Sequence, residues 1–391
     1  MTMVSLVFTA AFWPGLCLLI WTWAGYPAAL ALFGRLSSRP GSGPDGARPP
    51  AALPSITVII PVFNAGRALP AKLANCVELS YPEELVEILV ASDGSNDRSA
   101  EIAVRFAAEH PNIRLVESGG RVGKSAAQNL GASVAKGDIL LLTDVDTILA
   151  PDALRSVARC FERPEAGCVT GHVVWRAEHN VSRARADNLY WRFEHSMWRR
   201  ESALGILACA SGACMAVRSR LFRGIDPRYG DDVVVPLDVI QQGWRVAYDP
   251  SLLALERSSE RPAEALRTRA RMTQRSLRGT LSRRAVFSPA RRPVLCAAVL
   301  SHKLLRWATP FLFLLVLGSA VPLAIRGQTV ATAVLAAECA GLAAVLAGHV
   351  AYRMDVRVPV AAAAYAFALD NAGILIGVTR ALLGGPVVTF R

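Results

Sequence analysis

The sequence predicts an α/β domain with a mainly parallel sheet, together with about four membrane-spanning helices, one near the N-terminus and two or three near the C-terminus. Two observations predict this fold class. Short β-branched runs alternate with helical patterns from residue 56 to residue 146, which is typical of parallel sheets. Hydrophobic residues make up 52% of the chain, and their excess lies at its two ends, outside the α/β region.

The terminal apolar segments have the length of membrane helices. Residues 4–33 contain no charged residue and are long enough to cross a bilayer. A cleaved signal peptide is the alternative, but no Lys or Arg precedes the run and the run exceeds a signal peptide's apolar core. Residues 307–325 and 330–352 can also span. Residues 358–383 contain two ionisable residues, so either a span or a re-entrant helix is expected there.

The net charge of +12 suggests binding to nucleic acid or to an anionic membrane surface. Eleven Arg but only two Glu lie between residues 257 and 292, immediately before the second apolar block. A basic segment beside membrane helices marks the cytoplasmic side and contacts anionic headgroups. We therefore expect no nucleic-acid partner, and we expect an integral protein of a bacterial-type inner or plasma membrane whose central domain is cytoplasmic.

These patterns predict five regions. They are an N-terminal membrane helix at 1–34, a Pro- and Gly-rich linker at 35–54, the α/β domain at 55–285, an interfacial amphipathic helix at 286–306 and membrane helices at 307–391. The eight Cys residues show no metal-ligand spacing, so buried thiols are expected.

Candidate ligand-binding residues follow the predicted strands. The first strand is followed by Asn64, the second by Asp93, and the fourth by Asp144 and Asp146, while the third leads into the loop at 119–128. Because the carboxyl ends of parallel strands meet at one edge of a sheet, these residues predict a nucleotide site. Carboxylates at i and i+2 of an extended segment project from one face and suit Mg²⁺ or Mn²⁺ bound to a diphosphate.

Lys124 has two interpretations. Gly123-Lys124-Ser125 resembles the end of a phosphate-binding P-loop, but the first Gly of that motif would fall at Ser118. A membrane-associated P-loop-like NTPase is therefore the alternative function. Otherwise, Lys124 at a helix N-terminus pairs with a phosphate in another nucleotide-binding fold.

Asp231 and Asp232 form a second carboxylate pair, in front of a helical pattern. As first-turn charges they would only stabilise the helix N-terminus. The functional alternative is a general base at the start of the helix.

In their order along the chain, these motifs resemble the membrane-bound family-2 glycosyltransferases, which include cellulose, hyaluronan and chitin synthases. The resemblance covers residues 55–280. The matching segments are Pro61-Val62-Phe63-Asn64, Asp93, Lys124 with Asn129, Asp144-Val145-Asp146, Ser211-Gly212-Ala213 and Asp231-Asp232. The resemblance implies a GT-A, Rossmann-like catalytic domain that transfers a sugar with inversion from a nucleotide-diphosphate donor, expected to be a UDP-sugar, to a membrane-proximal glycan or lipid.

The resemblance also implies a role for each motif residue. Asp232 would be the catalytic base, and Asp144 and Asp146 would bind Mg²⁺ or Mn²⁺. The donor-binding residues would be Pro61, Asn64, Asp93, Lys124, Asn129, Asp144 and Arg271, and the acceptor-binding residues would be Ser211, Gly212 and Asp231. Membrane lipids, an export partner and a second copy of the chain are further expected partners.

Two departures from the family pattern bear on function. The family's Thr-Glu-Asp is Gly230-Asp231-Asp232 here, which keeps the presumed base. The polymerases of the family carry Gln-x-x-Arg-Trp, and the nearest match, residues 268–272, keeps Arg271 but lacks the Trp. The loss of this stacking surface for a sugar argues against processive polymerisation. Trp191 and Trp198, one heptad apart, predict either packing or an acceptor channel.

Overall fold

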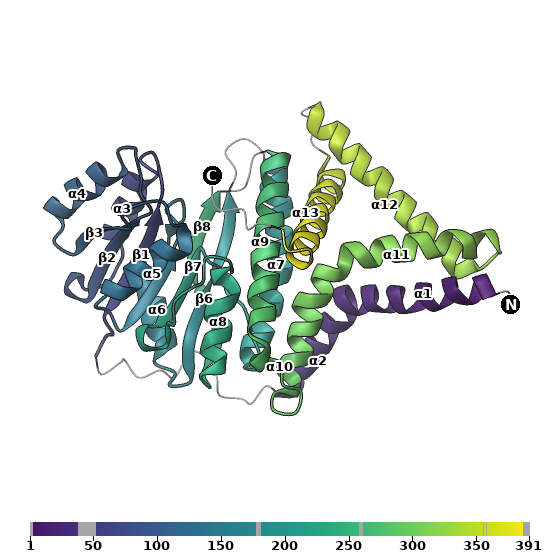
Figure 1. The fold of residues 1–391 in the computed structure, drawn as a ribbon, viewed down its shortest axis with the longest axis horizontal. Helices are drawn as coiled ribbons and strands as arrows, with labels where there is room; N and C mark the ends of the chain where they lie inside the picture. Colours follow the sequence, from purple (N-terminus) through teal and green to yellow (C-terminus); the bar gives the residue numbers. More distant parts are fainter. Residues whose placement is uncertain are drawn as a thin grey trace.

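The computed structural model describes residues 3–37, 52–176, 181–257, 261–354, 356 and 358–385. Most of the linker expected at 35–54 lies outside these ranges. The α/β domain contains an eight-stranded sheet in the order β3-β2-β1-β4-β7-β6-β8-β5 (Figure 1). The strands are β1 (Ile56–Val62), β2 (Val86–Ser92), β3 (Ile113–Glu117), β4 (Ile139–Thr143), β5 (Ile148–Leu149), β6 (Ala166–Arg176), β7 (Cys214–Arg218) and β8 (Arg245–Arg257).

The first half of the sheet is parallel, as the alternation of strands and helices predicts. Strand β1 pairs in parallel with β2 and β4, and β2 pairs in parallel with β3. Every residue of β1 and β4 is buried, because helices cover both faces of this part of the sheet. Near-continuous apolar strands are the consequence of that double cover.

The second half of the sheet mixes directions. Strand β7 is antiparallel to both β4 and β6, β6 is parallel to β8, and β5 is antiparallel to β8. The irregular pattern of the sequence after residue 146 reflects this change of direction. The parallel order that positions the strand-end motifs is confined to β1 to β4.

Helices on the two faces of the sheet form two apolar cores. On one face lie α3 (Leu69–Val77), α4 (Ser99–Glu109) and α6 (Ala153–Phe161), and on the other lie α5 (Lys124–Val134) and α8 (Asp231–Gln241). Two longer helices, α7 (Val181–Ala203) and α9 (Pro262–Ser282), stand between the sheet and the membrane helices (Figure 1).

Four helical segments are long and apolar enough to cross a membrane: Leu6–Gly34, Pro293–Ile325, Thr329–Arg353 and Pro359–Leu382. They comprise α1 (Met3–Ile20), α2 (Tyr26–Ser37), α10 (Pro293–Val299), α11 (Leu305–Ile325), α12 (Thr329–Arg353) and α13 (Pro359–Leu382). A separate interfacial helix at 286–306 was expected. In the structure, α10 continues through a π-helical turn (Leu300–Leu304) into α11, and no Pro or Gly lies between Pro293 and Pro310.

Helix α13, which the sequence predicts either as a span or as a re-entrant segment, is continuous over 24 residues. Its Asp370 accepts a hydrogen bond from Arg269 of α9 at 3.1 Å, so the ionisable group has the partner that such a position requires. The two helices lie side by side (Figure 1), and α9 thereby joins the membrane helices to the sheet.

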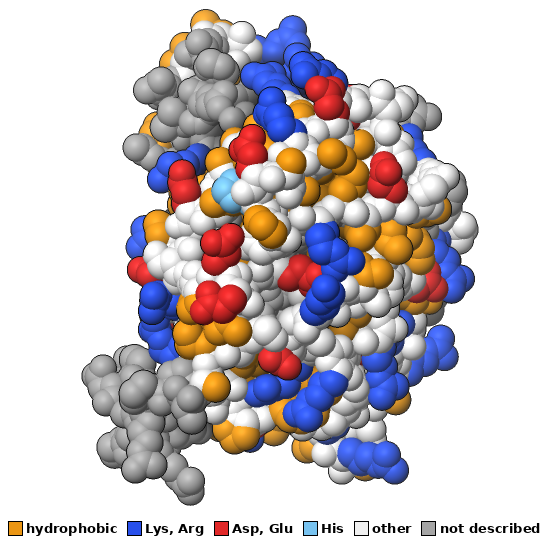
Figure 2. Space-filling model, turned by 90° about the vertical axis from the view of Figure 1, so that its left-hand side faces the viewer, with side chains coloured by type: hydrophobic (Ala, Val, Ile, Leu, Met, Phe, Trp, Pro, Cys, Tyr) orange, Lys and Arg blue, Asp and Glu red, His pale blue; other side chains and the backbone are white. Residues whose placement is uncertain are grey.

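Acidic and basic side chains are interspersed on the face of the α/β domain farthest from the membrane helices (Figure 2). The positive net charge is therefore not concentrated on that face. Helix α9, which contacts α13, carries five Arg residues among its 21, as expected for a basic segment beside a membrane.

Candidate functional site

A cavity of about 1020 Å³ lies over the carboxyl edge of the parallel strands. Asp93, directly after β2, and Asp144 and Asp146, after β4, line it at that edge. Its wall continues along α8 and α9 to Glu194 of α7 and to Lys303, in the π-helical turn that precedes α11. One cavity therefore connects the predicted nucleotide site with the membrane helices.

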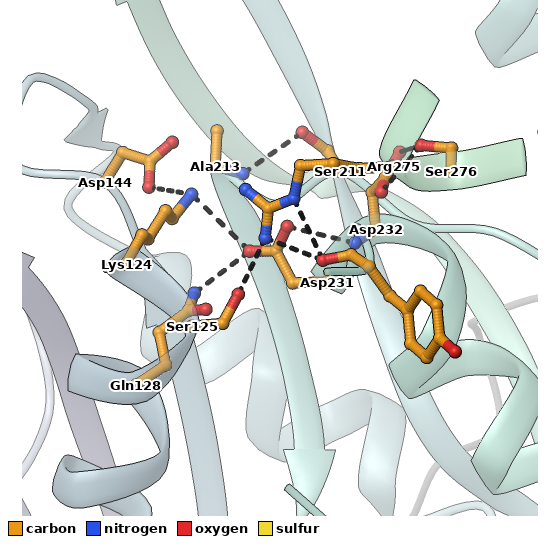
Figure 3. A network of polar contacts seen from close by, with 11 residues as sticks. Lys124, Ser125, Gln128, Asp144, Ser211, Ala213, Asp231, Asp232, Arg275 and Ser276 are labelled. Atoms are coloured by element: carbon orange, nitrogen blue, oxygen red, sulfur yellow. Dashed lines mark hydrogen bonds and ion pairs between the residues drawn. The ribbon is translucent and has the colours of Figure 1, made fainter. Parts of the chain in front are cut away.

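Lys124 joins the two predicted carboxylate pairs. Its Nζ lies 2.5 Å from Oδ1 of Asp144 and 3.4 Å from Oδ2 of Asp231 (Figure 3). Gln128 donates a further hydrogen bond to Asp231 at 3.0 Å. Although burial alone would raise the pKa of Asp231, Lys124 and Gln128 hold it at about 2. Asp231 is therefore a fixed anion that anchors Lys124.

Asp232 lies next to Asp231 in the first turn of α8 but has a different environment. Ser276 of α9 lies 3.2 and 3.1 Å from its two carboxylate oxygens and donates to it (Figure 3). Burial, and then the negative charge of Asp231, raise the pKa of Asp232 to about 6. A carboxylate with a pKa near neutrality has the basicity that proton transfer from a hydroxyl requires.

Arg275 crosses the floor of the site from α9. Its Nη2 donates to Ser125 Oγ at 2.8 Å and to the Tyr229 carbonyl at 2.6 Å. Contact with lipid headgroups was the expectation for Arg275 and Arg278. Instead, Arg275 reaches the start of α5, and Arg278 donates to the Gly385 carbonyl after α13. Both therefore hold α9 against its neighbours.

Ten of the twelve predicted site residues line the cavity. They are Pro61, Asp93, Lys124, Asp144, Asp146, Ser211, Gly212, Asp231, Asp232 and Arg271. Asp93 also orders the loop before α5, because its carboxylate accepts the N–H groups of Val122 and Gly123 at 2.7 to 2.9 Å. Those N–H groups are therefore not directed at a phosphate, as a P-loop would require.

The other two predicted residues, Asn64 and Asn129, are not among the described residues that line the cavity. The exposed Asn64, at φ 48°, accepts the N–H of Asn96. Asn129 exchanges two hydrogen bonds with the backbone of Ile225, at 2.8 and 2.7 Å. Both amides hold loop backbone groups in this structure, and their donor-binding role stays a prediction.

A buried lysine supports the loop that carries Asp144 and Asp146. Lys72 of α3 is fully buried and donates to Thr143 Oγ1 at 2.9 Å and to the Thr147 carbonyl at 2.6 Å. Burial lowers its pKa. Its position beneath the loop follows from tertiary packing, and no sequence motif marks it.

Glu256 lines the cavity and was also missed by the sequence analysis. It lies at the end of β8, and burial, and then the charges of Asp144 and Asp146, raise its pKa to about 8. A strand-end position was the available signal, but the order of β8 in the sheet could not be read from the irregular pattern.

The carboxylates fit a divalent cation only in part. Asp144 and Asp146 offer hard oxygen ligands on the cavity wall. Within the described residues, no group of three or more His, Cys, Asp or Glu side chains is arranged to hold a metal ion. A cation at this pair therefore requires further oxygen ligands, and a diphosphate is the kind of group that supplies them.

Aromatic side chains line the cavity toward the membrane. Trp191 stacks on Trp175 with ring centroids 6.0 Å apart and meets Trp198 edge-on at 5.7 Å. All three line the cavity. Trp191 and Trp198 therefore pack against their neighbours and also line the cavity, while the acceptor channel stays a prediction.

Known proteins resemble this chain in sequence and in fold. The model of glycosyl transferase family 2 matches residues 57–225. An N-acetylglucosaminyltransferase of Rhizobium leguminosarum bv. trifolii is 35% identical over 126 residues, which is 32% of this chain and 69% of that protein. One from Sinorhizobium fredii is 29% identical over 246 residues, 59% of each chain. The chain therefore belongs to glycosyl transferase family 2, and it spans somewhat more than half the length of the first of its curated relatives.

The solved structure of the mannosyltransferase PcManGT from Pyrobaculum calidifontis, in complex with GDP-Man and Mn²⁺, has the same architecture. The TM-score is 0.69 at 24% identity, over 95% of this chain and 99% of that one. The predicted fold class, a GT-A α/β domain with about four apolar helices long enough to span a membrane, is confirmed.

Proposed function

We propose that this protein is a membrane-embedded hexosyltransferase that moves a sugar, with inversion, from a UDP-sugar to a hydroxyl of a membrane-proximal acceptor. One observation carries the proposal. A single cavity contains the Asp144 and Asp146 pair at the sheet edge and Asp232, with its pKa of about 6, farther toward the membrane helices.

The donor would bind at the sheet edge. Asp144 and Asp146 would hold Mg²⁺ or Mn²⁺ together with the diphosphate, and such an ion would neutralise the charge of the leaving UDP. Lys124 and Arg271, both on the cavity wall, add positive charge beside that position. Asp93 and Pro61 would border the nucleoside.

In the chemical step, the acceptor hydroxyl loses its proton to the carboxylate of Asp232. The acceptor oxygen forms a bond to the anomeric carbon while the bond from that carbon to the diphosphate oxygen breaks, which releases UDP. Attack opposite the leaving group inverts the anomeric carbon. Ser276 orients Asp232 through its hydrogen bonds, and proton transfer of this kind typically contributes about 10²–10⁴-fold in rate.

The acceptor would lie beyond Asp232, beside Ser211 and Gly212. Trp191 supplies an aromatic wall there, which offers a stacking surface for a sugar in place of the Trp missing next to Arg271. Because the curated relatives are named N-acetylglucosaminyltransferases, UDP-N-acetylglucosamine is the first donor to test.

Nucleotide hydrolysis by a P-loop-like NTPase is the less favoured alternative. Two N–H groups of the loop before α5 are bound by Asp93, and the ammonium of Lys124 is paired with Asp144 and Asp231. These hydrogen bonds and ion pairs hold the loop and Lys124 to other residues of the site. The loop therefore lacks the geometry that a P-loop uses to surround a phosphate.

Two substitutions separate donor binding from chemistry. We expect Asp146→Ala to abolish Mn²⁺-dependent binding of UDP, measured by calorimetry. We expect Asp232→Asn to bind UDP as the wild type does and to lose about 10²–10⁴-fold in turnover, because only the base is removed. Asp238→Asn is the matched control, since Asp238 lies on the same helix but pairs with Arg283.

Either of two results would contradict these roles. Undiminished UDP affinity in Asp146→Ala with Mn²⁺ present would remove the metal role from this pair. Near-normal turnover in Asp232→Asn would remove the base assignment.

A further inference from the structure

A second, mostly apolar cavity of about 420 Å³ lies between the helices that join the α/β domain to the membrane segments. Its apolar wall comes from the N-terminal membrane segment, α7 and α13, through Trp23, Phe193, Ala363, Ala366 and Phe367. The polar groups of a sugar would find few hydrogen-bond partners along this wall, whereas a hydrocarbon chain needs none.

The apolar cavity adjoins the catalytic cavity. Four residues line both: Tyr190, Arg269, Arg306 and Ile374. Because α13 and the N-terminal segment are candidate membrane spans, the apolar cavity is positioned to receive a chain from the bilayer. A molecule that fills both cavities would have a hydrocarbon end and a polar end directed at Asp232.

A buried cation stands where the two cavities meet. The residue Arg306 is 6% exposed, and its Nη2 lies 2.8 Å from Glu194 Oε1. The guanidinium lies 4.3 Å from the ring centroid of Trp23. Within the described residues, its Nε and Nη1 have no hydrogen-bond partner. Unsatisfied donors on a buried cation are costly, so this position favours an anionic group.

Lys303 extends the positive charge toward the catalytic base. It lies one turn before Arg306 on the same helical segment and lines the catalytic cavity. An anion between Lys303 and Arg306 would therefore lie on the path from the apolar cavity to Asp232.

We propose that the apolar cavity binds one membrane lipid with an anionic, hydroxyl-bearing headgroup, and that this lipid is the acceptor. The acyl chain would lie between α7 and α13, the phosphate beside Arg306 and Lys303, and the headgroup hydroxyl near Asp232. The acceptor assignment rests on the proposed function, whereas the lipid site itself does not.

The lipid site can be tested without donor or turnover. The full-length protein is placed in phosphatidylcholine nanodiscs with a small fraction of phosphatidylglycerol that carries a diazirine in one acyl chain. After photolysis, mass spectrometry locates the adducts. We expect them to concentrate on Phe193 and Phe367. A matched diazirine phosphatidylcholine should give roughly ten-fold less at these positions, because its phosphate is the same but its choline cation would be repelled by Arg306 and Lys303.

A cavity-filling variant with a matched control separates this site from the surrounding bilayer lipid. Ala363→Phe places a ring in the cavity and should reduce the adducts at Phe193 by about ten-fold, as expected when a bound group is sterically excluded. Ala364→Phe adds the same volume to α13 at a position outside the described cavity lining and should leave the adducts unchanged.

Three outcomes would overturn the proposal: equal labelling by the two lipids, labelling spread along the outer faces of the spans, or equal adducts in both variants. Each would indicate surrounding bilayer lipid only. If specific labelling is found but labelled phosphatidylglycerol is not glycosylated by any UDP-sugar, the lipid site stands and its role as acceptor fails.

Discussion

At the scale of single residues, two adjacent carboxylates are given different roles by their neighbours. Asp231 is held at a pKa of about 2 by Lys124 and Gln128, whereas burial and the charge of Asp231 raise the pKa of Asp232 to about 6. Environments that separate the pKa values of paired carboxylates are the physical mark of an acid–base site. One residue anchors a cation, and the other is free to exchange a proton.

The base assignment predicts a pH profile. Asp232 must be ionised to accept a proton, so kcat/KM for transfer should be level above pH 7 and fall about ten-fold per pH unit below 6. The measurement is initial rates across pH 4.5–8.5 at fixed Mn²⁺. A profile that stays level through pH 5 would contradict the assignment.

The same pKa predicts a stability change of defined sign. A carboxyl whose folded pKa is raised stabilises the fold fully below its unfolded pKa of about 4, and this contribution is lost as pH rises through about 6. At pH 8, Asp232→Asn should therefore have a free energy of unfolding higher than the wild type by on the order of 1 kcal/mol, and melt at a higher temperature. Near pH 4 the two proteins should match. A lower melting temperature at pH 8 would contradict the buried-carboxylate account.

Most of the residues that motif order predicted line the cavity, but motif order did not show which of them also fix a loop. Asn64 and Asn129 belong to matching motifs, yet their amides bond backbone groups of Asn96 and Ile225. Lys72 carries no motif, and its place beneath the Asp144 loop arises only when α3 packs on the sheet.

At the scale of elements, local pattern predicted the first half of the domain closely. The alternation of strands and helices predicted over residues 56–146 contains β1 to β4, because each of these strands is a short run bounded by turn residues. The order of strands β6 to β8 in the sheet was not predicted, because it depends on pairing between segments distant in sequence.

The loop after β4 depends on Lys72, and this dependence can be measured. Lys72→Met keeps the length of the side chain but leaves the Thr147 carbonyl without its donor, which costs about 1–3 kcal/mol. We expect UDP affinity with Mn²⁺ to fall about ten-fold, as calorimetry would show. Lys136→Met, at an exposed lysine, is the control. Equal affinities in both variants would show that the loop keeps its shape without Lys72.

Close packing of α13 on α9 relies on glycine. A Cβ at Gly377 would lie 2.5 Å from the Ala270 carbonyl oxygen, whereas a Cβ at Gly341 of α12 would meet nothing within 4 Å. Gly377→Ala should therefore lower the melting temperature. Gly341→Ala should leave it unchanged or raise it, because helix propensity adds up to about 1 kcal/mol to the free energy of unfolding. If both variants gain stability, the close contact between the two helices is wrong.

At the scale of the whole molecule, a buried polar network joins the membrane helices to the site. Tyr26 of α2 donates to Glu201 of α7, and His302 lies between Glu201 and Glu194 at 2.8 and 3.0 Å. Glu194 also pairs with Arg306. The hydrogen-bonded partners in this network are 101 to 175 residues apart along the chain. The sequence therefore offered no sign of the network.

This network and the shared cavity join the candidate membrane helices to the proposed catalytic site. Glu194 and Lys303 line the same cavity as Asp144. An acceptor that arrives along the membrane would reach Asp232 without leaving the protein, which is the arrangement that a membrane-proximal acceptor requires.

The most direct test of the central claim is UDP release from a panel of UDP-sugars by the purified protein with a membrane lipid extract, with and without chelator. We predict release from one UDP-sugar, with UDP-N-acetylglucosamine the first candidate, that stops with chelator and returns with Mn²⁺ or Mg²⁺. Release that is unaffected by chelator, or phosphate release from UTP without any sugar, would contradict metal-dependent sugar transfer at this site.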